Sequence, residues 1–264
     1  MKAYDFEYDG DNLSNKGFII CKFGRQGIQT ISNGSYITFN TVSTGHGQKH
    51  ELTSVEYEEC LSTTFQICKH PCIGDAEEVS TSEQREMMRW LNRKEFLKFK
   101  LLSPEYADIY WECTFNISKI EIEGKVYGFE LEVITNRPFA LMETVEVNIT
   151  NLQDNGKKTV SSLSDEIGYI YPYMEITIDK SGDLEIFNEL ENRTMRIANC
   201  VEGEVITLRY PMIETSESSH RIQNDFNWVF FRLANTFKKR KNELSISIPC
   251  TIKMAYNPII KLSI

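Results

Sequence analysis

The sequence Ile120-Glu121-Ile122-Glu123 is followed by Gly124 and, a little further on, by Phe129-Glu130-Leu131-Glu132-Val133. Apolar and charged residues alternate in both runs, and successive side chains of a β-strand point to opposite faces. A glycine between two such runs is typical of a turn. The segment therefore predicts a β-hairpin with one buried face and one solvated face, the latter carrying the four glutamates.

The same alternation recurs further along the chain, in residues 145–149, 174–178, 206–210 and 244–248. Pairs of turn-forming residues separate the runs: Asp9-Gly10, Asn33-Gly34, Glu123-Gly124, Asn155-Gly156, Ser181-Gly182 and Glu202-Gly203. Many short strands between regular turns are typical of β-sandwiches and barrels. We therefore expect an all-β protein.

One segment departs from this pattern and predicts a helix. Ser80 and Glu83 have the spacing of a capping box, in which the hydroxyl and the carboxylate bond to free backbone N–H groups. Met87, Met88, Trp90 and Leu91 then follow at helical spacing, so we expect a helix over about residues 82–93 that packs on a sheet.

A second helix is predicted over residues 227–236, where Val229, Phe230, Leu233 and Phe237 are in phase. A buried strand over residues 228–233 is the alternative. The polar residues 151–166 are expected to form an exposed loop.

The boundary between two domains is expected at Asn136-Arg137-Pro138. A strand ends at Ile134, and Pro138 has no N–H to donate to a β-ladder. A new alternating run starts at Val145. The predicted domains are residues 1–137 and residues 138–264, and both are acidic.

Composition narrows the class of protein. The 264 residues are 41% hydrophobic and 25% charged, which is enough to form a core, and the net charge is −9. An acidic chain argues against a general nucleic-acid binder and against a polybasic membrane-surface protein. No apolar run is long enough to span a bilayer, and residues 1–10 do not have the pattern of a secretory signal. The seven cysteines are therefore expected to be reduced.

Metal and catalytic sites receive little support from the motifs. Cys60, Cys68, His70 and Cys72 are close in sequence, but their spacing is irregular for a structural zinc site. His46, His50 and His220 lie near no nucleophile motif such as Gly-x-Ser-x-Gly. We therefore predict no catalytic, cofactor-binding or metal-binding residues and no enzymatic activity.

Two further segments have ambiguous roles. Gly24-Arg25-Gln26-Gly27 lacks the spacing of a phosphate-binding loop. Lys238-Lys239-Arg240-Lys241 is the basic run of the chain, and it is either a solvated turn or a contact for an anionic partner. The sequence leaves the role of this basic run and all interface residues unknown.

Several segments together resemble one protein family. The C-terminal half has the strand entry Cys200-Val201-Glu202-Gly203-Glu204-Val205-Ile206-Thr207-Leu208 and the return strand Lys241-Asn242-Glu243-Leu244-Ser245-Ile246. Other matching segments are Asn224-Asp225-Phe226-Asn227, Phe231-Arg232-Leu233, Phe6 and Tyr8, Lys16-Gly17-Phe18-Ile19-Ile20, a long strand over residues 57–68, Arg89-Trp90-Leu91-Asn92-Arg93 and Tyr110-Trp111-Glu112-Cys113. In this order they resemble the siphophage distal tail proteins (Dit). The chain departs from the family at the basic run, where a glycine is usual, and it is too short for the carbohydrate-binding insertions of larger relatives.

The resemblance implies a fold and a role. The fold is an N-terminal β domain with one helix, followed by a galectin-like or carbohydrate-module-like β-sandwich. The N-terminal domains of such proteins form a homo-hexameric ring at the virion tail tip, and DNA passes through its lumen. The ring joins the tail tube protein to the tail-associated tip protein or baseplate, and the C-terminal domains can carry receptor-binding proteins.

The resemblance further implies a virion structural protein that is made in the bacterial host cytoplasm and has no membrane contact. A phage, a prophage and a phage-tail-like bacteriocin all fit it. Two other functions are considered: a saccharide-binding module that uses Tyr169, Tyr171, Tyr173 or Trp228, and a tail-associated hydrolase.

Overall fold

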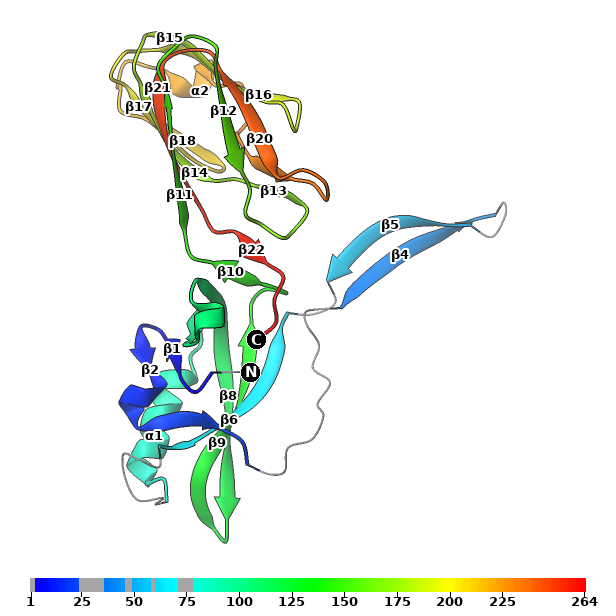
Figure 1. The fold of residues 1–264 in the computed structure, drawn as a ribbon, viewed down its shortest axis with the longest axis vertical. Helices are drawn as coiled ribbons and strands as arrows, with labels where there is room; N and C mark the ends of the chain where they lie inside the picture. The colour runs from blue at the N-terminus through cyan, green and yellow to red at the C-terminus, as the bar shows by residue number, and fades with distance from the viewer. Residues whose placement is uncertain (1–2, 24–35, 46–48, 58–59, 71–77) are drawn as a thin grey trace. The chain divides into compact units, whose positions relative to one another are not determined.

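The computed structural model describes residues 3–23, 36–45, 49–57, 60–70 and 78–264. The chain forms two compact units (Figure 1), one of Met1–Leu141 with Ile260–Ile264 and the other of Met142–Ile259. Both units consist mainly of strands, which confirms the predicted all-β fold class. No local sequence signal indicates that the last five residues return to the first unit.

The first unit is built around one large antiparallel sheet. Within the described residues its strands follow the order β2-β1-β7-β8-β9-β6-β3, and β10 pairs with both β8 and β22. Its elements are β1 (Phe6–Tyr8), β2 (Asp11–Asn12), the 3₁₀ helix Leu13–Lys16, β3 (Phe18–Cys21), β4 (Ile37–Thr44), β5 (Lys49–Tyr57), β6 (Ser62–Lys69), α1 (Thr81–Leu91), β7 (Leu97–Leu101), the 3₁₀ helix Pro104–Tyr106, β8 (Ile109–Ile122), β9 (Lys125–Thr135), β10 (Ala140–Met142) and β22 (Ile259–Ile260).

The predicted central hairpin is formed by β8 and β9. Ile122 pairs with Lys125 across a two-residue turn in which Glu123 and Gly124 both have positive φ, as the common hairpin turns require. Leu131 and Val133 are fully buried and Glu132 is exposed, so the alternation does separate two faces. Ile122, near the turn, is an exception and is exposed.

The predicted helix is α1, and Ser80 caps it. The Ser80 hydroxyl accepts the Glu83 N–H, and the Glu83 carboxylate accepts the Ser80 N–H, so the capping box is complete. Met87 and Leu91 are buried, and the Trp90 ring stacks on Phe6 at 5.6 Å. The Trp90 indole also donates to the Tyr8 carbonyl at 3.2 Å.

The long strand expected over residues 57–68 is wrong in its extent. Tyr57 ends β5, and β6 begins only at Ser62. The two strands also belong to different sheets, because β5 pairs with β4 whereas β6 pairs with β3 and β9.

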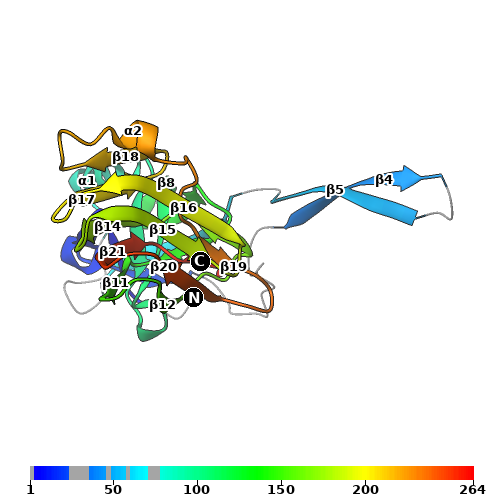
Figure 2. The same ribbon diagram turned by 90° about the horizontal axis from the view of Figure 1, so that it is seen from above.

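The second unit is a β-sandwich. Within the described residues a five-stranded sheet has the order β11-β21-β14-β17-β18, and a four-stranded sheet has the order β12-β20-β15-β16. Figure 2 shows strands of both sheets running side by side. The elements are β11 (Val145–Asn151), β12 (Gly156–Ser161), β13 (Gly168–Ile170), β14 (Tyr173–Ile178), β15 (Gly182–Asn188), β16 (Arg193–Cys200), β17 (Val205–Arg209), β18 (Met212–Thr215), α2 (Ile222–Asp225), β19 (Leu233–Asn235), β20 (Lys241–Ile246) and β21 (Cys250–Tyr256).

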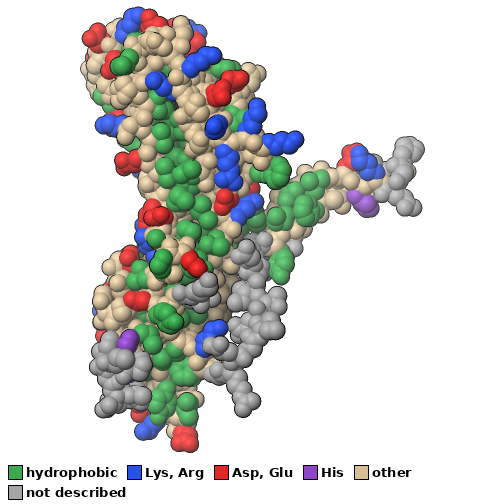
Figure 3. Space-filling view, viewed as in Figure 1, with side chains coloured by type: hydrophobic (Ala, Val, Ile, Leu, Met, Phe, Trp, Pro, Cys, Tyr) green, Lys and Arg blue, Asp and Glu red, His purple; other side chains and the backbone are tan. Residues whose placement is uncertain are grey.

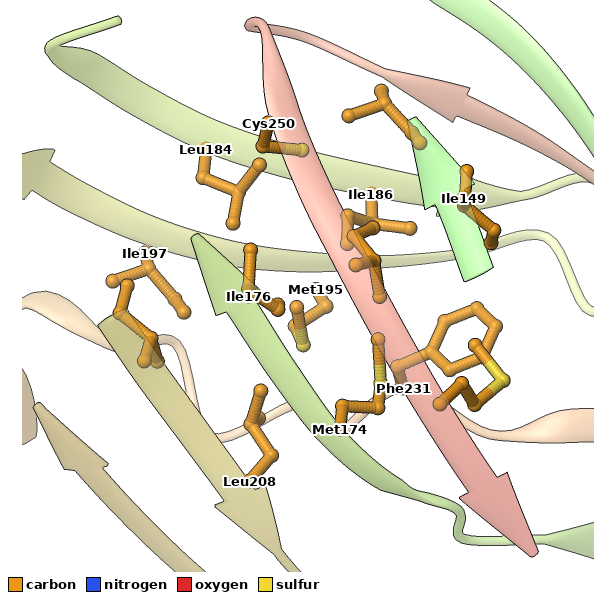
Figure 4. Close-up of a cluster of buried hydrophobic side chains, with 14 of the residues drawn as sticks. Ile149, Met174, Ile176, Leu184, Ile186, Met195, Ile197, Leu208, Phe231 and Cys250 are labelled. Carbon is orange, nitrogen blue, oxygen red and sulfur yellow. The ribbon is translucent and has the colours of Figure 1, made fainter. Parts of the chain in front are cut away.

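Apolar side chains from both sheets fill one common core (Figure 4). Ile176 and Leu208 come from the five-stranded sheet, and Ile186 and Met195 come from the four-stranded sheet. Inward-facing residues of two sheets that share a core are the defining feature of a sandwich.

Two predictions for the second unit are wrong. Residues 227–236 form no helix, and the alternative strand is also incorrect, because β19 starts only at Leu233. Asn227 fixes an irregular turn here: its side chain donates to the Thr194 carbonyl and accepts the Val229 N–H, and Trp228 between the two has a positive φ. Residues 151–166 are not one exposed loop either, because β12 lies within them and pairs with β20.

The longest helix in the described part of the chain is α1, with 11 residues. None of the described helices is long and apolar enough to cross a membrane.

Candidate functional site

The cysteines considered for zinc do not converge on one point. Cys60 precedes β6 and Cys68 lies near its other end, and a strand rises about 3.3 Å per residue. These two thiols therefore cannot both reach one metal ion at about 2.3 Å. Cys72 lies outside the described residues, as do His46 and Gly24-Arg25-Gln26-Gly27. Among the residues that the structure describes, no three His, Cys, Asp or Glu side chains are grouped as metal ligands.

Three other cysteines are buried, and burial raises their pKa. The pKa of the Cys113 thiol lies far above its usual range, and the pKa values of Cys200 and Cys250 are raised to about 12. A thiol is nucleophilic only as the thiolate. These three cysteines therefore have the character of core residues.

His220 takes part in a buried polar cluster that sequence motifs did not reveal. Its Nδ1 atom lies 2.6 Å from Oε1 of Glu204, and the two side chains are only 2% and 1% exposed. Thr215 donates its hydroxyl to the same carboxylate oxygen, and the Val201 N–H donates to the other at 2.9 Å. Nε2 of His220 lies 3.4 Å from Oδ2 of Asp225. These contacts connect the turn before β17, the end of β18 and α2. The geometry of the cluster is therefore that of a structural contact that holds these three segments together.

Three of the four aromatic residues predicted for saccharide binding belong to one connected series of aromatic rings, namely Tyr169, Tyr171 and Trp228. Tyr171 stacks on Tyr210 with their ring centroids 4.0 Å apart, beside a pocket of about 490 Å³ whose walls include Tyr173, Arg209 and Asn257. Tyr169 is exposed, but the Arg232 guanidinium covers its ring at 3.7 Å.

Trp228 is exposed and contacts Phe226 and Phe230; it does not line that pocket, but Phe230 also packs on the wall residue Tyr210 at 5.3 Å. Tyr210 was missed by sequence reasoning, because its exposure and its stacking on Tyr171 depend on the folded arrangement of β17 and the segment before β14.

The hairpin of β4 and β5 exposes a row of apolar side chains. Within the described residues the two strands pair only with each other. Phe39 is paired with Val55, Ile37 with Tyr57, and Thr41 with Leu52, so their side chains share one face. Phe39 is 63% exposed, and Ile37, Leu52 and Val55 are also exposed. Figure 3 shows hydrophobic side chains along this hairpin. Ile37 and Phe39 are two residues apart, as apolar residues on one face of a strand are, so the sequence contains a signal for this exposed apolar row.

Comparisons with known proteins now identify the family. The sequence model described as "Phage tail protein N-terminal domain" matches residues 1–137, and the model described as "Phage tail C-terminal domain" matches residues 139–256. The chain belongs to the phage tail protein family. Among curated proteins, none matches the sequence.

The fold of this phage tail protein is similar to that of a solved structure. That structure is the SPP1 Dit protein (gp 19.1), described as a paradigm of the hub adsorption apparatus in phages that infect Gram-positive hosts. The TM-score is 0.65 at 11% sequence identity, over 97% of this chain and 99% of the other. The resemblance to the siphophage distal tail proteins that the sequence motifs indicated is therefore confirmed.

Proposed function

We propose that this phage tail protein is the distal tail hub, in which six copies form a ring that joins the tail tube to the tail-tip or baseplate proteins. The observation that carries the proposal is the β4–β5 hairpin. A two-stranded hairpin on its own is marginally stable in water, and this one exposes Phe39 and Val55 side by side. Exposed apolar rows of this kind mark protein–protein contacts.

A neighbouring copy is the proposed partner of the hairpin. Rings form when one surface of a subunit contacts a different surface of the next and the rotation closes. An apolar hairpin whose strands, within the described residues, pair only with each other contributes one such surface. The similarity of this fold to that of the SPP1 Dit protein supports the arrangement, because that protein is described as a paradigm of a hub adsorption apparatus. The acidic chain also suits a DNA conduit, since a basic lumen would bind phosphates and slow transit.

Size-exclusion chromatography with light scattering tests the ring. The expected particle has a mass of about 184 kDa, six times that of the 30.6 kDa chain. Phe39→Glu is expected to shift the protein to smaller species, because it places a charge in the apolar row. Leu152→Glu is the matched control: it changes an exposed leucine of the second unit and should leave the mass unchanged.

A ring that closes only when the protein is part of an assembled tail would not be detected by chromatography. Electron microscopy of tails assembled with each variant tests that case. Tails that assemble normally with Phe39→Glu, together with a monomeric wild-type protein, would contradict the proposal.

A second candidate function is saccharide binding by the second unit. The observation that favours it is the Tyr171–Tyr210 stack beside a pocket, in which Tyr210 is 54% exposed. An exposed tyrosine offers an apolar ring face, on which a sugar ring packs, and a hydroxyl for hydrogen bonds. A glycan array probed with the full chain tests it. Binding that Tyr210→Ala abolishes and Trp228→Ala leaves unchanged would support this pocket, and an array without signal would dismiss it.

A further inference from the structure

The basic run lies on the wall of a pocket in the second unit. The pocket has a volume of about 770 Å³ and lies between three segments. Its walls are formed by the β19–β20 loop with the start of β20, by the end of β12 with the residues after it, and by the segment after β15. The sequence left open whether this run is a solvated turn or a contact, so its surroundings decide the question.

Hydrogen bonds hold the basic loop in a defined conformation. The Thr236 N–H donates to the Lys239 carbonyl at 2.8 Å, and the Lys239 N–H donates back to the Thr236 hydroxyl at 2.9 Å. At the base of the loop, fully buried Asn242 donates to the carbonyls of Ala234 and Arg240. A freely solvated turn would not need a buried amide at its base. The loop is therefore an ordered platform, and ordering it costs a ligand little entropy.

The positive charges of the loop are available to a ligand. In the described part of the chain, Lys238, Lys239 and Lys241 form no ion pair, whereas Arg240 contacts Asp165 at 3.4 Å. Three close lysines that form no ion pair repel one another, although Glu189 and Glu243 also line the pocket, and a bound anion relieves that repulsion. Their accumulation is notable in a chain whose net charge is −9.

An apolar group lies next to these charges. Phe237 is 88% exposed, and Leu163 on the opposite segment is also exposed. Exposed aromatic rings in a pocket are typical of protein contact sites. The pocket thus presents cations and apolar surface together, and a ligand that satisfies both must carry acidic and apolar groups.

We propose that this pocket binds an acidic segment of a partner protein. Carboxylates of the segment contact Lys238, Lys239 and Lys241, and an apolar side chain packs on Phe237. Glu189 and Glu243 also line the pocket, so a polymer with a phosphate on every unit would meet repulsion. A peptide places acidic and uncharged groups at different positions and avoids those carboxylates. The inference does not depend on the ring.

Fluorescence anisotropy of a labelled peptide tests the proposal with the full chain. The probe is a fluorescein-labelled peptide in which Asp and Glu alternate with uncharged residues on both sides of a central Leu-Phe pair. The wild-type protein should bind it, and added salt should weaken binding because exposed charges are screened. The double variant Lys238→Glu, Lys239→Glu should weaken binding by about tenfold or more, since both contacts become repulsive.

Matched variants and probes separate the pocket from general electrostatics. Lys157→Glu with Arg221→Glu makes the same change of charge on the same unit, at two exposed residues outside the pocket, and should leave binding near that of wild type. Phe237→Ala should weaken the Leu-Phe peptide severalfold but not a peptide with Ser-Ser in its place. Thermal unfolding checks that each variant is folded.

Three results would overturn the inference. They are equal binding by the wild type and the Lys238, Lys239 variant, equal loss in the control variant, and tighter binding of inorganic polyphosphate than of the peptide. The last would assign the pocket to an anionic polymer in place of a protein segment.

Discussion

The imidazole of His220 and the carboxylate of Glu204 lie 2.6 Å apart inside the C-terminal sandwich, where water reaches neither side chain to any extent. Because buried polar groups must be satisfied by protein partners, each of these residues depends on the other. The same carboxylate also accepts the Thr215 hydroxyl and the Val201 N–H, so removing His220 leaves a buried acid with fewer donors.

The first prediction concerns the stability of this cluster. His220→Ala should lower the free energy of unfolding by about 1–3 kcal/mol, because it leaves the Glu204 carboxylate partly unsatisfied and opens a cavity. Urea unfolding followed by tryptophan fluorescence measures it. His50→Ala is the control, since His50 is exposed on β5, and it should change little. A His220→Ala protein as stable as the control would show that the cluster contributes nothing.

The second prediction uses the capping box of α1. Burial raises the pKa of Glu83, but hydrogen bonds from Ser80 and Lys69 outweigh this effect, so the pKa is lower than its usual value. A carboxyl group with a lowered pKa in the folded state stabilises the fold above its unfolded pKa of about 4.3, and this contribution disappears as pH falls through the folded pKa.

The stability advantage of the wild type over Glu83→Gln should therefore be present at neutral pH and shrink in acid. Urea unfolding at a series of pH values measures it. Glu95→Gln, an exposed residue outside the helix, controls for the loss of one negative charge at neutral pH. An advantage that grows as the pH falls would contradict the assignment.

The features that sequence alone predicted are local ones. The β8–β9 hairpin follows from the alternation of its own residues and from Glu123-Gly124 at the turn. Helix α1 follows from Ser80 and Glu83, which are three residues apart and bond to each other. In both cases the residues that make the contact are also neighbours in the chain.

The features that sequence missed depend on distant residues. Residues 227–236 have helical periodicity, yet Asn227 bonds to the backbone of β16, and Phe230 and Phe231 are both buried in the sandwich core from a segment that is not helical. The orientation of the basic loop likewise depends on Asn242, whose amide oxygen accepts from Asn188 at 2.8 Å across 54 positions of sequence. No local pattern encodes such contacts.

The third prediction concerns cysteine reactivity. Cys60 is exposed and should react with iodoacetamide in the folded protein, whereas Cys200 and Cys250 should not. Burial raises the pKa of both to about 12, so only a very small fraction is thiolate near neutral pH. Peptide mapping by mass spectrometry after brief labelling measures this, and labelling in urea controls for intrinsic reactivity. Equal labelling of Cys200 and Cys60 in the folded state would contradict the buried placement.

The fourth prediction tests a close approach in the N-terminal sheet. A Cβ atom added at Gly128 in β9 would lie 2.3 Å from the backbone carbonyl oxygen of Ile67 on the neighbouring strand β6. Since a backbone atom cannot turn aside as a side chain can, Gly128→Ala must displace β6 or β9, and it should cost about 1–3 kcal/mol of unfolding free energy. Gly45→Ala is the matched control, because its added methyl group meets open space. Urea unfolding should therefore separate the two alanine variants, and equal midpoints would show that the two strands are further apart than the structure places them.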